Sequence, residues 1–124
     1  MADTQHKIIY MCTCGGEDAE KASICIGLAN AGLALEEDVS LILMGKGVYL
    51  GQKGYADHIH RAGDRAPLKK LISDFMSLGG KLFVCKPCIE ERNMGLSDFI
   101  EGAELATGTT LNMLILESDK QLVF

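Results

Sequence analysis

The chain has 124 residues, of which 48% are hydrophobic and 23% are charged, a composition that suits one compact globular domain spanning residues 1–124. The net charge of −5, with no cluster of lysine or arginine, gives no electrostatic support for binding nucleic acid or an anionic membrane surface. The polar first residues do not resemble a signal peptide, and no apolar run approaches the roughly 18 residues of a membrane span, so we expect a cytoplasmic protein.

Apolar runs alternate with segments of helical periodicity along the chain. Strands are predicted at residues 7–12, 38–44, 82–85, 100–104 and 121–124. Helices are predicted at residues 18–31, from Pro67 to Gly79-Gly80, at residues 87–93 and after Gly108-Thr109-Thr110, with a loop at residues 51–65. This alternation predicts an α/β fold, a flavodoxin-like three-layer αβα arrangement with a mostly parallel five-stranded sheet.

Two pairs of cysteines lie where predicted strands end, at the carboxyl ends of the strands, where ligands of such folds bind. If the strand order is the flavodoxin-like 2-1-3-4-5, the first and third strands are neighbours. The loop with Cys12 and Cys14 then faces the loop with Cys85 and Cys88. The five cysteines are an odd number, and in a reducing compartment we expect free thiols, metal ligands or catalytic sulfur rather than structural disulfides.

Cys85 is predicted to be a reactive thiol because it lies where a strand is followed by a helix. Backbone N–H groups, the helix dipole and the adjacent Lys86 are expected to lower its pKa, and the alternative is a cysteine that only packs. Cys88 follows Pro87 at the spacing of a disulfide at a helix start, so it is either a resolving thiol or a passive first-turn residue. A thioredoxin fold is disfavoured because no later proline is available to face the thiols.

Cys14 lies in a Gly-Gly turn that is expected to expose its thiol to backbone N–H groups, whereas Cys12 either packs or takes part in the chemistry. If the two loops converge, Cys12, Cys14, Cys85 and Cys88 can hold zinc or an iron–sulfur cluster; otherwise no cofactor is expected. Cys25 is interpreted as helix core.

Four further residues are candidates for supplying charge or protons near these loops. His58 and His60 face the same way if their segment is extended, so they either supply a proton donor or belong to a solvated loop. Lys46 and Arg92 either add positive charge near the thiols or are solvated surface residues.

The sequence resembles the DsrE/TusD-like (DsrE/DsrF-like) family of sulfur-relay proteins over nearly its whole length. The matching features are the apolar first strand, Gly47-Val48-Tyr49, a strand that ends in Cys85, Arg92, the Gly108-Thr109 start of the last helix, and the ending 118–124. The resemblance implies a five-stranded α/β domain that assembles into trimers or hexamers. It also implies that Cys85 carries a persulfide received from a sulfurtransferase and passed to another carrier.

Cys88, Cys12 and Cys14 are not required by the family motif. A thiol next to a persulfide can attack it, releasing sulfide and leaving a disulfide. We therefore predict a sulfur-relay protein that carries sulfane sulfur on Cys85 between donor and acceptor proteins, with a thiol redox or metal-binding module as the alternative.

Overall fold

Five parallel strands form one sheet in the order β4-β3-β2-β1-β5 in the computed structural model, which describes residues 4–61 and 65–124. The strands are β1 Lys7–Cys12, β2 Asp38–Leu43, β3 Lys81–Cys85, β4 Ala103–Ala106 and β5 Lys120–Val123. The α-helices are α1 Ala19–Ala34, α2 Leu68–Ser77, α3 Lys86–Glu90 and α4 Gly108–Glu117. The predicted α/β class with a parallel five-stranded sheet is confirmed.

The strand order differs from the flavodoxin-like order, because β2 lies between β1 and β3. Helix α1 connects β1 to the neighbouring strand β2, and α2 connects β2 to the neighbouring strand β3. Helix α4 connects β4, at one edge of the sheet, to β5 at the other edge. Residues 39–43 of β2 are all buried, as a strand needs to be when both its faces are covered and both its edges are paired.

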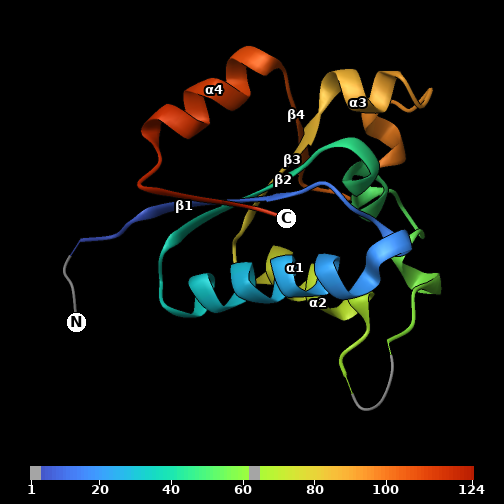
Figure 1. The fold of residues 1–124 in the computed structure, drawn as a ribbon, viewed down its shortest axis with the longest axis horizontal. Coiled ribbons are helices and arrows are strands. Elements are labelled where there is room, and N and C mark those ends of the chain that lie inside the picture. Colours follow the sequence, from blue (N-terminus) through green and yellow to red (C-terminus); the bar gives the residue numbers. More distant parts are fainter. Residues whose placement is uncertain (1–3, 62–64) are drawn as a thin grey trace.

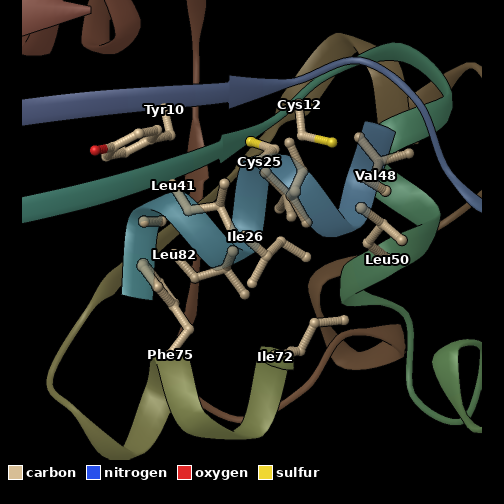
Figure 2. Close-up of a cluster of buried hydrophobic side chains, with 14 of the residues drawn as sticks. Tyr10, Cys12, Cys25, Ile26, Leu41, Val48, Leu50, Ile72, Phe75 and Leu82 are labelled. Carbon is tan, nitrogen blue, oxygen red and sulfur yellow. The ribbon is translucent and has the colours of Figure 1, made fainter. Parts of the chain in front are cut away.

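Helices cover both faces of the sheet, with α1 and α2 on one side and α4 on the other (Figure 1). Consecutive strand residues point to opposite faces, so each strand contributes to two cores. On the α1/α2 face, Leu41 and Leu82 pack with Ile26 and Phe75 (Figure 2). On the α4 face, a second cluster contains the alternate strand residues together with Leu111 of α4. The sheet is therefore the middle of three layers.

Several element boundaries differ from the sequence prediction by one to three residues. The fourth strand was expected at residues 100–104 but begins at Ala103, because Gly102 adopts a φ of 95° in a turn just before it. The first helix continues to Ala34, three residues beyond its predicted end at Ala31. None of the helices in residues 4–61 and 65–124 is both long and apolar enough to cross a membrane.

Candidate functional site

Cys85 and Cys88 form a pair of contacting free thiols at the carboxyl end of β3. Cys85 is the last residue of the strand and the N-cap of α3, and Cys88 lies in the first turn of that helix. Their sulfur atoms are 3.0 Å apart and share a hydrogen bond. Cys85 is buried, with 6% of its surface exposed, whereas Cys88 is partly exposed. The predicted proximity of these two thiols is therefore present in the folded chain.

The position of Cys88 is fixed by contacts from two other segments. The backbone N–H of Gly45, in the turn after β2, donates to Cys88 Sγ at 3.3 Å. Gly45 has a φ of 54°, which glycine adopts without strain. Arg92 Nη1 donates to the Cys88 carbonyl at 2.9 Å, and Pro87 occupies the first turn of α3. Cys88 is thus held at a defined distance from Cys85.

The expected lowering of the Cys85 pKa is not found. Burial of the side chain raises the pKa of Cys85 above its usual value, and the hydrogen bond with Cys88 raises it further. The backbone of Cys88 opposes this, as predicted for a helix start, but α3 has only five residues and the desolvation of Cys85 is the larger effect. Lys86 is exposed and does not offset the burial.

Cys12 and Cys14 form a second thiol pair, on the α1/α2 side of the sheet. Their sulfur atoms are 3.9 Å apart, and the Cys12 thiol donates to the Cys14 carbonyl at 3.3 Å. Cys14 was expected to be exposed, but it is 6% exposed, and burial raises the pKa of its thiol to about 12. Cys12 is fully buried and lies beside Cys25 (Figure 2). A hydrogen bond with the Cys25 thiol lowers the pKa of Cys12 to about 7.

The two thiol pairs do not form one cluster. Cys85 packs in the core under α4, and Cys12 and Cys14 pack in the core under α1 and α2, whereas Cys88 lies against both cores. Within the described ranges, no group of three or more His, Cys, Asp or Glu side chains is placed to hold a metal ion. The convergence of Cys12, Cys14, Cys85 and Cys88 that a zinc or iron–sulfur site requires is therefore not observed, because β2 separates the strands that carry them.

A hollow of about 340 Å³ lies at the same carboxyl edge of the sheet. Its lining residues are Glu17, Lys46, Tyr49, Tyr55 and Arg92. The Arg92 guanidinium lies 5.6 Å from the centre of the Tyr49 ring, which stacks on Tyr55 at 5.5 Å. Lys46 and Arg92 therefore line the same hollow, and the hydrogen bond from Arg92 to the Cys88 carbonyl connects this hollow to the thiol pair.

Gly45 and the two tyrosines were not identified as site residues from the sequence. Tyr49 belongs to the Gly47-Val48-Tyr49 segment that carried the family resemblance, which is the signal that pointed to this loop. Gly45 and Tyr55 gave no comparable signal. His58 and His60 are both exposed, which agrees with their interpretation as part of a solvated loop.

Sequence comparisons identify relatives of similar length. A model of the DsrE/DsrF-like family matches residues 6–124. An uncharacterized protein of Methanopyrus kandleri is 33% identical over 106 residues, which are 85% of this chain and 83% of that protein. An uncharacterized protein of Methanocaldococcus jannaschii is 30% identical over 105 residues, which are 85% of this chain and 88% of that protein.

Solved structures share the fold. The ychN protein from E. coli aligns with a TM-score of 0.71 and 21% identity, covering 98% of this chain and 100% of that one. A protein of unknown function from Methanobacterium thermoautotrophicum aligns with a TM-score of 0.72 and 11% identity, covering 97% and 100% of the two chains. With the family match extending from residue 6 to the last residue, the chain belongs to the DsrE/DsrF-like family.

Proposed function

We propose that this protein is a sulfur-relay carrier that holds sulfane sulfur as a persulfide on Cys85 and delivers it to a partner protein. The observation that carries the proposal is the position of Cys85 at the carboxyl end of β3, in contact with a second thiol at 3.0 Å. Membership of the DsrE/DsrF-like family supports the proposal. The resemblance described from the sequence implies that Cys85 occupies the family's sulfur-carrying position.

Loading is a thiol exchange at the terminal sulfur of a donor persulfide. The Cys85 sulfur bonds to that terminal atom, the donor S–S bond breaks, and the donor cysteine leaves with the electron pair. Because burial raises the pKa of Cys85, the group is a thiol at neutral pH and has to lose its proton to attack as a thiolate. The departing donor sulfur takes up a proton, so the exchange balances. Delivery repeats the exchange with an acceptor thiol as the nucleophile.

Access to Cys85 is restricted. The side chain is 6% exposed, whereas the added sulfur of a persulfide extends it by about 2 Å. We propose that donor and acceptor proteins dock at the carboxyl edge of the sheet, where Lys46 and Arg92 line the neighbouring hollow. Two of the three charged side chains that line the hollow are cationic and the third is Glu17, and this excess of positive charge suits partners with acidic surfaces.

We also propose that the protein forms a homo-oligomer, a trimer or hexamer as in its family. Large apolar side chains are exposed on the outer side of α4 and on β5. The exposed fractions are 84% for Leu116, 57% for Met113 and 67% for Val123. Large apolar side chains that are this exposed are candidates for burial in an interface between subunits.

The test is whole-protein mass spectrometry after incubation with a persulfide donor or with thiosulfate. We expect a gain of about 32 Da, one sulfur atom, in the Cys88→Ser variant and no gain in Cys85→Ser. Cys25→Ala is the matched control, because Cys25 lies in α1, in the other core, and this variant should react like the unmodified chain. Sulfur that remains bound in Cys85→Ser, or stoichiometric zinc or iron held by the thiols, would refute the proposal.

A further inference from the structure

We propose that Cys88 discharges the Cys85 persulfide, so that the protein also reduces sulfane sulfur to sulfide. This inference rests on the proposed function, since it requires a persulfide on Cys85. The observation behind it is that Cys88 Sγ contacts Cys85 Sγ, the inner sulfur of that persulfide, at 3.0 Å.

The discharge balances without an additional oxidant. A bond forms between Cys88 Sγ and Cys85 Sγ, and the bond from Cys85 Sγ to the terminal sulfur breaks. The terminal sulfur leaves as hydrosulfide with the bonding electrons, and the Cys88 proton is released or combines with it as hydrogen sulfide. The sulfane sulfur is reduced and the two cysteines are oxidised to a disulfide. A dithiol reductant is then needed to restore the free thiols.

The geometry favours attack on the inner sulfur of the persulfide. A disulfide has an S–S length of about 2.05 Å, so Cys88 Sγ has to approach Cys85 Sγ by about 1 Å from its present contact at 3.0 Å. Which sulfur of a persulfide is attacked depends on access, and Cys88 Sγ already lies against the inner one. The Gly45 N–H and the Arg92 contact hold the first turn of α3 in this position.

The other thiols are not placed for the same reaction. Cys12, Cys14 and Cys25 are buried in the core on the face of the sheet opposite to Cys85; Cys88 packs against both cores, but the thiol in hydrogen-bond contact with it is that of Cys85. Cys88 is partly exposed, so the hydrosulfide has a route to solvent from its neighbourhood. The discharge should therefore depend on Cys88 and be unaffected by Cys25.

The experiment uses one equivalent of glutathione persulfide added to the fully reduced protein without oxygen, so that sulfane sulfur is the available oxidant. We expect the unmodified chain to release one sulfide per chain and to lose about 2 Da as the Cys85–Cys88 disulfide forms. Cys88→Ser should retain the added sulfur, with sulfide release slowed about tenfold or more. Cys25→Ala should behave like the unmodified chain.

Three results would overturn the discharge, and they separate it from the carrier function. If the unmodified chain retains its sulfur as long as Cys88→Ser and forms no disulfide, carriage stands and discharge is wrong. If peptide mapping finds the sulfur moved onto Cys88, the attack is on the terminal sulfur instead. If Cys88→Ser never gains sulfur, both the carrier function and the discharge are wrong.

Discussion

Oxidation of Cys85 and Cys88 to a disulfide should stabilise the folded chain. The two sulfur atoms are 3.0 Å apart in the folded protein, so the bond can form with a movement of about 1 Å. Closing a loop as short as residues 85–88 lowers the conformational entropy of the unfolded chain by an amount worth about 2 kcal/mol at 25 °C. For a chain of 124 residues this corresponds to a rise in melting temperature of about 8 °C.

The measurement should be made in a Cys14→Ser background. Cys12 and Cys14 have sulfur atoms 3.9 Å apart and could otherwise oxidise together. Urea unfolding of the reduced and oxidised forms, with the disulfide assigned by peptide mass mapping, gives the difference in free energy of unfolding. By the same thermodynamic cycle, the disulfide should have a reduction potential about 40 mV more negative in the folded chain than in the unfolded chain.

A matched control is the variant that also carries Cys88→Ser. Its stability should be the same under oxidising and reducing conditions, because no partner for Cys85 remains in contact. If oxidation of Cys85 and Cys88 instead destabilises the chain by more than about 1 kcal/mol, forming the bond strains the native geometry. The contact between the Cys85 and Cys88 sulfur atoms would then not favour disulfide formation, and the proposed discharge reaction would lose its structural basis.

Three other changes test the surroundings of the site and the proposed assembly. An added Cβ in Gly47→Ala would overlap the Cys12 carbonyl, so this variant should lose about 2 kcal/mol in its free energy of unfolding in urea. An unchanged free energy of unfolding would contradict the close approach of Gly47 to the Cys12 carbonyl. Burial raises the pKa of Cys85 in the folded chain above its ordinary value of 9.0. The protonated thiol therefore contributes to stability below pH 9.0, and this contribution is lost as the pH rises through the pKa of the folded chain. The free energy of unfolding should thus fall less steeply above pH 9.0 in Cys85→Ser, and Cys85 alkylation with a midpoint below 9.0 would refute this. Leu116→Glu places a charge at an 84% exposed apolar position and should shift native mass spectra toward the monomer, whereas an unchanged oligomer would exclude Leu116 from the interface.

The sequence predicts the strands and helices well because burial leaves a direct pattern in residue type. Residues 38–44 are mostly apolar, and most of this segment forms the central strand, in which residues 39–43 are buried. The pattern of residue types does not determine the order of the strands in the sheet. This order depends on where each crossover places the next strand, and local periodicity is the same whether β3 lies beside β1 or beside β2.

The candidate site was predictable where spacing alone decides it. Cys85 and Cys88 are separated by two residues at a strand-to-helix junction, which brings their sulfurs together in any fold of this class. The pKa of Cys85 was not predictable, because it depends on the balance between burial and the helix N-terminus. Cys14 is a similar case, since its Gly-Gly turn suggested exposure but the packing of the α1/α2 core buries it.

If Cys85 carries a persulfide as proposed, its contact with Cys88 sets a kinetic condition on sulfur transfer. An attacking thiol within the same chain reacts as though it were present at a very high local concentration, whereas an acceptor protein must first diffuse to the site. Carriage can therefore compete with discharge only if a docked acceptor prevents Cys88 from reaching the inner sulfur. The Arg92 hydrogen bond to the Cys88 carbonyl gives a route for this, because Arg92 also lines the hollow at which a partner would dock. A partner that engages Arg92 would loosen the first turn of α3 and protect the persulfide for transfer.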